Sequence, residues 1–386
     1  MHLIFKSLER FDEYLPGFKD RYLEKFLWNY DDIKNIKDPI REIEKIKYLN
    51  VEFLFFSEKY SNLILKLRHA GYKVGLIGGI FTEKFASRYN IPYISSYPFK
   101  KLIIDFYFKD KALEKSETKL TICKLVNIIK NTSIKYLILP IDYLFLERFL
   151  IYIFKQAGKK TITIQDGFVS KKKNSIFPLW LSLKEKISDI YMVWGEYFFN
   201  IQKKYFKNTK ILGYPHKLNF YLENKKTYNY KNRICLVGQD FENYDLHLGK
   251  IKQKLFSEIS YILKKFNFNV FYKPHPSERN SFIPKKVKIF KGTLSDAFRF
   301  FDVFIGINST LLMEASLNKK IAIQILLEKF PCDNFQQIGI SYTYENKNLK
   351  FLPKFIKKIK KHLYISQKVV LRKECIHKRF IEILKN

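Results

Sequence analysis

The stretch Val270-Phe271-Tyr272-Lys273-Pro274-His275-Pro276 holds the clearest structural signal in the chain. Its β-branched and aromatic half is typical of a buried strand, and its Pro-His-Pro half is typical of a rigid turn. In open parallel α/β sheets, ligands bind outside the carboxyl ends of the strands. The sequence therefore predicts a strand that delivers His275 to a ligand-binding edge, where the flanking prolines restrict its backbone.

A second apolar strand, Val303–Gly306, ends in Ile307-Asn308-Ser309-Thr310 and runs into a predicted helix. Ser and Thr are favoured helix caps, and their hydroxyl groups and the free N–H groups of a helix start suit a phosphate. Glu314 follows about one turn later on the same face, where a carboxylate could accept hydrogen bonds from a ribose diol. A histidine and a phosphate cradle at two strand ends suggest a nucleotide site, whereas the simpler alternatives are a His-Pro turn, a plain cap and a solvated glutamate.

The third motif is Gln165-Asp166-Gly167, which follows the apolar strand Thr161–Ile164. Asp-Gly is a common turn, so a purely structural role is a strong alternative. A carboxylate at the carboxyl edge of a sheet could also deprotonate an acceptor hydroxyl, and Gly167 would let the backbone approach a substrate closely. Asp166 is therefore the candidate general base.

Apolar strands and amphipathic helices alternate from Val51 to Ile323, which predicts parallel sheets joined by helical crossovers. A length of 386 residues favours two domains. The fold class that we predict is α/β with two Rossmann-like domains whose parallel sheets face an interdomain cleft. The predicted regions are an acceptor-side domain at 1–213, a nucleotide-donor domain at 214–350 and a basic helical region at 351–386.

The predicted strands are Val51–Phe56, Lys73–Gly79, an edge strand at Ile91–Ile94, Tyr136–Pro140, Thr161–Ile164, Ile190–Val193, Ile234–Gly238, Val270–Lys273, Val287–Phe290, Val303–Gly306 and Ile321–Ile323.

Two further residues near the predicted turns are candidate donor contacts. Gly238 ends the strand Ile234–Gly238, but Val-Gly-Gln-Asp is not a dinucleotide fingerprint. Lys273 precedes the Pro-His-Pro turn, although a regular strand would point it away from Tyr272. His216 is interpreted as a surface histidine near the interdomain hinge. No His, Asp or Glu cluster has a convincing metal spacing, so no metal is expected.

The composition is strongly basic, with 71 Lys and Arg against 37 Asp and Glu and a formal net charge of +34. Such a field attracts polyanions, and without any nucleic-acid-binding motif an anionic membrane surface is the preferred partner. A solvated basic surface that reflects codon bias is the alternative. No apolar run approaches the roughly 20 residues of a membrane-spanning helix, no signal peptide is recognised, and four scattered cysteines fit a reducing cytoplasm.

Taken together, Gln165-Asp166-Gly167, His275-Pro276 and Ser309-Thr310 resemble the motif set of bacterial sialyltransferases with the GT-B fold. That family has an acidic-acidic-Gly motif in its first domain and His-Pro and Ser-Ser/Thr motifs in its second. The resemblance implies that Asp166 is the general base and that His275, Ser309 and Thr310 bind the CMP of a CMP-sialic acid donor. Gln165 departs from the pattern, so another carboxylate such as Glu196 or Asp240 is an alternative base.

The resemblance implies an inverting, metal-independent transfer of sialic acid, or a related nonulosonic acid, to a glycan or glycolipid acceptor of lipooligosaccharide, capsule or O-antigen. The CMP-sugar would be a substrate, so no cofactor is expected. The Lys-Pro-His-Pro strand is also similar to transferases of the teichoic-acid and capsule type, which makes a GT-B transferase with CDP-glycerol or another nucleotide-sugar as its donor the first alternative. The second alternative is a noncatalytic, basic membrane-binding protein. The expected location is cytoplasmic and peripheral on the inner membrane.

Overall fold

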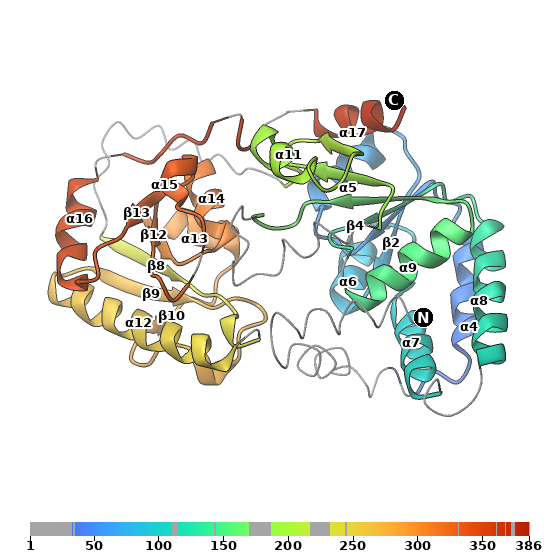
Figure 1. Cartoon of the computed structure of the whole chain (residues 1–386), viewed down its shortest axis with the longest axis horizontal. Helices are drawn as coiled ribbons and strands as arrows, with labels where there is room; N and C mark the ends of the chain where they lie inside the picture. The colour runs from blue at the N-terminus through green and yellow to red at the C-terminus, as the bar shows by residue number, and fades with distance from the viewer. Residues whose placement is uncertain are drawn as a thin grey trace. The chain divides into compact units, whose positions relative to one another are not determined.

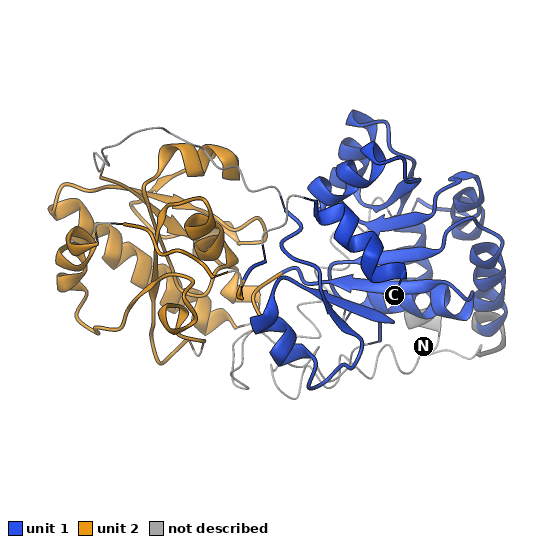
Figure 2. Ribbon diagram, turned by 90° about the horizontal axis from the view of Figure 1, so that it is seen from above, with its two compact units in different colours: residues 1–166, 181–216, 370–386 blue, residues 167–180, 217–369 orange. Residues whose placement is uncertain are grey.

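The computed structural model describes residues 33, 35–109, 115–142, 144–169, 187–216, 232–243, 245–330, 332–359, 361–366, 368–371 and 375–385. The chain forms two compact units, each with its own parallel sheet (Figures 1 and 2). The first unit comprises residues 1–166, 181–216 and 370–386, and the second comprises residues 167–180 and 217–369. Among the described residues no sheet runs through both units, which confirms the predicted pair of parallel α/β sheets.

The first unit has a seven-stranded sheet in the order β3-β2-β1-β4-β5-β6-β7. Every strand pair in it is parallel, and the central strands are buried. Its strands are β1 (Phe53–Phe56), β2 (Val74–Gly78), β3 (Tyr93–Ser95), β4 (Tyr136–Leu139), β5 (Lys160–Ile164), β6 (Ile190–Val193) and β7 (Thr209–Ile211). Its α-helices are α4 (Pro39–Glu44), α5 (Ser61–His69), α6 (Ile80–Arg88), α7 (Tyr97–Lys109), α8 (Lys115–Lys130), α9 (Phe145–Gln156), α11 (Glu196–Gln202) and α17 (Ile376–Lys385).

The second unit has a six-stranded sheet in the order β10-β9-β8-β11-β12-β13, again with parallel pairs throughout. Its strands are β8 (Arg233–Val237), β9 (Asn269–Lys273), β10 (Lys288–Ile289), β11 (Val303–Gly306), β12 (Ile321–Ile325) and β13 (Tyr342–Tyr344). Its α-helices are α12 (Leu246–Lys265), α13 (Leu294–Phe300), α14 (Thr310–Leu317), α15 (Phe335–Ile338) and α16 (Leu352–Lys358). Short 3₁₀ turns lie at Lys45–Tyr48 in the first unit and at Phe241–Asn243, Asn280–Phe282 and Leu349–Phe351 in the second.

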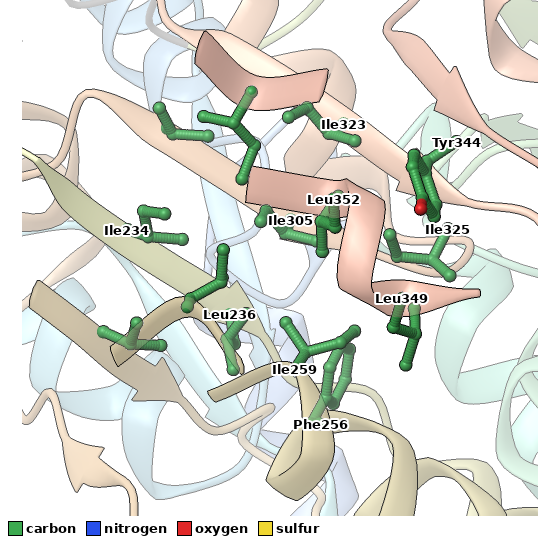
Figure 3. Packing of buried hydrophobic residues seen from close by; sticks show 14 of the residues in the cluster. Ile234, Leu236, Phe256, Ile259, Ile305, Ile323, Ile325, Tyr344, Leu349 and Leu352 are labelled. Carbon is green, nitrogen blue, oxygen red and sulfur yellow. The ribbon is translucent and has the colours of Figure 1, made fainter. Parts of the chain in front are cut away.

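The core of the second unit shows why these segments form strands and helices. Ile305 and Ile323 from β11 and β12 pack with Phe256 and Ile259 from α12 and with Leu352 from α16 (Figure 3). The apolar stripe of α12 therefore covers one face of the sheet, as its helical periodicity requires. Asp245 begins this helix by accepting hydrogen bonds from the N–H groups of residues 247 and 248.

The predicted strands are all present, with shifted ends, and β3 lies at a sheet edge as its proline predicted. Strands β7 and β13 and helices α6, α7, α8, α11 and α15 were not predicted from the sequence. Most of the first 34 residues and all of 217–231, which include most of a polar Lys/Asn/Tyr-rich stretch, lie outside the described residues. Short segments of mixed polarity such as Thr209–Ile211 carry no clear alternation, and their pairing with a neighbouring strand decides their structure.

The C-terminal tail divides between the two units. Helix α16 buries Leu352 and Ile356 in the core of the second unit. After a non-helical connection among the described residues, α17 buries Ile376 and Phe380 in the core of the first unit, and the Phe380 ring lies 5.9 Å from that of Phe53. The tail, which the sequence marked as one basic region, thus contains two helices with separate apolar faces.

Candidate functional site

The strand order of the second unit creates a switch point at its centre. From β8 the chain continues through β9 and β10 on one side of the sheet, and through β11, β12 and β13 on the other. Such a reversal leaves a crevice at the carboxyl ends of the two central strands, which is where ligands bind in open α/β sheets. The turns after β8, β9 and β11 contain Gly238, His275 and Asn308, so the predicted nucleotide residues lie at this edge.

Gly238 lets the first two of these turns approach each other closely. Its N–H group donates to the carbonyl of Lys273 at 2.9 Å. A Cβ atom at this position would lie 2.8 Å from the backbone nitrogen of His275 and would also collide with the Glu278 carboxylate. The glycine predicted as a donor contact therefore has a clear structural role, because only a residue without a side chain fits beside the His275 turn.

The His275 turn is held by its own backbone and by Glu278. The N–H group of His275 donates to Glu278 Oε2 at 3.0 Å, and the N–H group of Glu278 donates to the carbonyl of His275 at 2.9 Å. Pro276 lies inside this turn, where its ring fixes φ. The sequence prediction of a rigid strand-to-turn junction is thus confirmed.

The imidazole of His275 is partly exposed, at 41% of its side chain, and its hydrogen bonds define a tautomer. The N–H group of Ser277 donates to Nδ1 at 3.2 Å, so Nδ1 is the acceptor and Nε2 carries the proton of the neutral ring. The carboxylate of Asp240 lies 3.8 Å from Nδ1. The ring can therefore present an Nε2–H donor to an anion.

The third turn joins the other two through a glutamine that the sequence analysis did not single out. Gln239 follows Gly238, and its Oε1 accepts a hydrogen bond from the N–H group of Asn308 at 2.9 Å. Asn308 is buried, and its Oδ1 has no hydrogen-bond partner among the described residues. Ser309 caps α14 by accepting from the N–H group of Leu311 at 3.2 Å, as the sequence predicted.

Thr310 and Glu314 occupy the first turns of α14. Thr310 Oγ1 accepts a hydrogen bond from the N–H group of Phe168 at 3.3 Å, so this hydroxyl helps to bind the segment that follows Asp166. Phe168 packs its ring 4.8 Å from that of Phe335. Glu314 is half-buried one turn into the helix, and its backbone carbonyl accepts from Asn318 Nδ2 at 2.8 Å.

The side chain of Lys273 points toward β10 and not along the turn. Its Nζ donates to the carbonyl of Gly292 at 3.0 Å and lies 5.8 Å from the centre of the Phe290 ring. The three connected turns thus contain Gly238, His275, Pro276 and Asn308, and the last of them leads into Thr310. The Lys273 ammonium group does not join them, because it binds the carbonyl of Gly292.

In the first unit, Asp166 follows β5 at the carboxyl edge of the other sheet. Its carboxylate forms an ion pair with Lys59, which follows β1. The preceding Gln165 is buried, and its side-chain oxygen accepts from the N–H group of Trp194 at 3.2 Å. Its backbone carbonyl accepts from Trp194 Nε1 at 2.8 Å. Gln165 is therefore part of the core, whereas Asp166 is the partly exposed member of the motif.

Two more titratable groups lie close enough to this ion pair for its charges to shift their pKa values. His216 is half-buried and packs its ring 5.6 Å from Tyr60, so its interpretation as a surface histidine was wrong. Burial lowers the pKa of His216, while Asp166 raises it. The Tyr60 hydroxyl donates to the carbonyl of Ile164, and burial together with Asp166 raises the pKa of Tyr60. The surroundings of Asp166 are thus partly desolvated.

Glu147 is a buried carboxylic acid that the sequence analysis missed. It lies in the first turn of α9, and its Oε2 has no hydrogen-bond partner in the described part of the chain. Burial raises the pKa of the Glu147 carboxyl to about 7, against the opposing charges of Lys100 and Lys59. The only signal in the sequence was an acidic residue within an otherwise apolar helix face.

The two alternative bases differ in their surroundings. Glu196 is exposed at the start of α11. Asp240 belongs to the second unit beside His275, where its side chain also accepts a hydrogen bond from Asn243 Nδ2 at 3.1 Å. In the described parts of the chain, no group of His, Cys, Asp and Glu side chains is arranged to bind a metal. Over the same residues, no helix combines the length and hydrophobicity that a bilayer span requires.

Comparison with known proteins bears on both the fold and the activity. Residues 169–326 match the family model of alpha-2,8-polysialyltransferases, so the match includes the three turns of the second unit. No curated protein sequence gives a significant match. The matched region supports the sialyltransferase resemblance and a glycosyltransferase activity, which argues against the noncatalytic alternative.

Solved structures with the same architecture confirm the GT-B fold. The UDP-GlcNAc 2-epimerase of Methanocaldococcus jannaschii, in complex with UDP-GlcNAc and UDP, has a TM-score of 0.57 at 13% identity, covering 86% of this chain and 99% of that one. Anabaena Alr3699/HepE, in complex with UDP and glucose, has a TM-score of 0.54 at 11% identity, covering 87% and 99%. S. aureus MnaA with UDP has a TM-score of 0.54 at 11% identity, covering 86% and 95%.

Proposed function

We propose that this glycosyltransferase moves sialic acid, or a related nonulosonic acid, from a CMP-sugar to a glycan acceptor with inversion at C2. The observation that carries the proposal is the polysialyltransferase match, because it spans β8 to β12 and the turns with His275 and Ser309. The same turns meet at the switch point of the second sheet, where a nucleotide is expected.

The donor phosphate would lie between the His275 turn and the start of α14. His275 offers Nε2–H, and the α14 terminus offers N–H groups and the positive end of its dipole. Negative charge grows on the CMP phosphate as the C2–O bond to it breaks. Hydrogen-bond donors fixed beside that oxygen therefore stabilise the transition state more than they stabilise the bound CMP-sugar. This difference in stabilisation is the condition for catalysis. Ser309 and Thr310 would contribute through this helix start.

Asp166 would take the proton of the acceptor hydroxyl as the acceptor oxygen attacks C2. Its carboxylate lies at the carboxyl end of β5 and forms an ion pair with Lys59, and a positioned carboxylate of this kind can accept the proton of a bound hydroxyl. Gln165 has no ionisable group and is hydrogen-bonded to Trp194 in the core, so the residue at the first position of the acidic motif cannot act as the general base. Since the protein groups named above supply the charge stabilisation, we expect transfer to continue in EDTA.

The acceptor in this proposal is a surface glycan or glycolipid of lipooligosaccharide, capsule or O-antigen. A lipid-linked acceptor would be found at the cytoplasmic face of the inner membrane. The net charge of +34 would hold the protein there by attraction to anionic head groups. The protein would thus work as a peripheral membrane enzyme.

The donor is tested first by thermal unfolding in the presence of CMP, CDP, UDP and GDP. A ligand that binds the native state stabilises it by RT ln(1 + [L]/Kd), so at equal concentrations the tightest ligand raises Tm most, and CMP is expected to give the largest shift. Release of sialic acid from CMP-sialic acid and of glycerol phosphate from CDP-glycerol, each of which leaves CMP, is then compared with and without EDTA. Turnover of CDP-glycerol alone, or a shift only with UDP or GDP, would contradict the proposed donor.

A further inference from the structure

A lysine with no exposed side-chain surface lies beneath the nucleotide turns of the second unit. Lys252 projects from α12 between the carboxylates of Glu242 and Glu278, and all three side chains are fully buried. Its Nζ donates to the carbonyl of Gln239 at 2.7 Å, to Glu242 Oε2 at 3.1 Å and to Glu278 Oε1. An ammonium group has three N–H donors, so these three bonds saturate it.

Each acceptor of this ammonium group also holds a turn at the sheet edge. Glu278 Oε2 accepts from the N–H group of His275, and Glu242 Oε1 accepts from the N–H group of Arg279 at 2.9 Å. Gln239, whose carbonyl binds Lys252, accepts from the N–H group of Asn308 through its side chain. One buried charge therefore connects the turns after β8, β9 and β11.

Stability alone is a poor explanation for this arrangement. Removing two carboxylates and an ammonium group from water is expensive, and apolar side chains of similar volume often serve a core as well or better. Tyr272 donates its hydroxyl to Glu278, and both burial and the Glu278 charge raise the pKa of Tyr272. Besides binding Lys252, each carboxylate accepts a hydrogen bond from a backbone N–H group of the turn after β9. Such a pattern is typical of a network that orients other residues.

We propose that Lys252 is a positioning residue, which acts through Glu242, Glu278 and Gln239 to set the His275 turn and the Asn308 turn at the spacing that the nucleotide requires. This inference rests on the proposed nucleotide site. Gly249 supports it, because a Cβ atom there would lie 2.7 Å from Glu242 Cβ, so the glycine brings α12 against the network.

The test compares Lys252→Met with Glu278→Gln, which keeps the shape of the side chain, and with a neutral triple variant, Lys252→Met/Glu242→Gln/Glu278→Gln. Lys250→Met, an exposed lysine of the same helix, is the matched control. Urea unfolding identifies the folded variants. Titration with CMP gives the affinity, and steady-state kinetics separate the KM of the donor from that of the acceptor.

A second readout needs no ligand. Correlation spectra of ring nitrogens in ¹⁵N-histidine-labelled protein report which nitrogen of His275 carries the proton, and His275→Ala assigns its signals. The bond from Ser277 to Nδ1 depends on the turn that Glu278 holds, so its loss should shift both ring signals. A change in overall stability alone would not alter the tautomer of a folded variant.

We expect Lys252→Met, Glu278→Gln and the neutral variant, where folded, to weaken CMP binding about 10- to 100-fold, the range for losing an outer partner of a binding group. Donor KM and the His275 ring signals should change with it, whereas acceptor KM and the Lys250→Met variant should match the wild type. Wild-type CMP affinity and wild-type ring signals in folded Lys252→Met or in folded Glu278→Gln would overturn the inference. If the wild-type protein binds no CMP, the proposed function is refuted instead. The two failures can be distinguished, because the His275 ring signals report on the turn without any ligand.

Discussion

His275 is the residue on which the proposed chemistry depends most directly. Its backbone N–H group donates to Glu278, and its Nδ1 accepts a hydrogen bond from the N–H group of Ser277. These two bonds set the orientation of the ring before any ligand binds. A donor that needs no reorganisation contributes most when charge develops beside it. The His275→Ala variant should therefore lower kcat for transfer about 100-fold or more, the scale for removing one preorganised donor.

Steady-state transfer assays with a saturating CMP-sugar measure this effect. His247→Ala, an exposed histidine in the first turn of α12, is the control and should keep the wild-type rate. A wild-type kcat in His275→Ala would remove this histidine from the mechanism.

Glu147 makes a separate prediction about pH and stability. Its carboxyl has a pKa of about 7 in the folded chain, above the usual value near 4.5, because burial disfavours the charged form. Lys100 from α7 and Lys59 after β1 are the charges that act on it. The folded state therefore holds this proton more tightly than the unfolded state between these two pH values, so stability falls as pH rises through that window.

The expected loss is about 3 kcal/mol of unfolding free energy between pH 4.5 and pH 8. Urea unfolding of the wild type and of Glu147→Gln at several pH values isolates the effect as a difference between the two curves. Glu83→Gln, an exposed change on α6, should retain the wild-type slope. Parallel curves for the wild type and Glu147→Gln would show that the carboxyl does not titrate in this range.

Among the secondary-structure elements, α14 has a structural and a proposed functional role at the same terminus. Ser309 caps it, so Ser309→Ala should lower the unfolding free energy by about 1 kcal/mol. Thr293 caps α13 with a capping box, and Thr293→Ala is expected to lower stability by a similar amount. Of these two variants, only Ser309→Ala should also weaken CMP binding, because α14, unlike α13, begins at the switch point.

Urea unfolding and CMP titration of the two cap variants measure these effects side by side. Equal CMP affinity in both variants would mean that Ser309 is a helix cap and nothing more. A large loss of affinity in Thr293→Ala would indicate that the α13 terminus also belongs to the site.

At the scale of the whole molecule, the charge of +34 predicts attraction to anionic membranes. Helix α16 buries its apolar residues in the core of the second unit. Exposed lysines lie on this helix and just after it: Lys354, Lys357, Lys358 and Lys361. Lys360, the fifth lysine of this basic stretch, lies outside the described residues. Each lysine near an anionic surface contributes about 1 kcal/mol, so the cluster could hold the protein at low salt.

Co-sedimentation with neutral and anionic vesicles tests this attachment. We expect binding to anionic vesicles only, with release as added salt shortens the screening length from about 10 Å at 0.1 M to about 3 Å at 1 M. Changing Lys354, Lys357, Lys358 and Lys361 to Gln should weaken binding more than changing four exposed lysines of the first unit, Lys47, Lys73, Lys84 and Lys135. Equal binding to neutral vesicles would reject an electrostatic attachment.

Much of the architecture follows from local sequence. The alternation of apolar strands with amphipathic helices predicts two parallel sheets, since periodicity and turn residues act within a few residues of each other. The Pro-His-Pro turn after β9 and the Ser309 cap of α14 are local features of this kind, and both are present. Strands β7 and β13 escaped prediction because their partners in the sheet, and not their own composition, stabilise them.

The sequence by itself determined the fold class and the turns at which chemistry is expected, because hydrophobic periodicity, prolines and capping hydroxyls act locally. Only the tertiary structure decided how those turns are connected. Lys252 meets Glu278, Gln239 meets Asn308 and Lys59 meets Asp166 across long stretches of chain. The roles of Gln165 in the core and of Glu147 as an acid with a raised pKa were decided there too, since burial and hydrogen bonding depend on packing between distant segments.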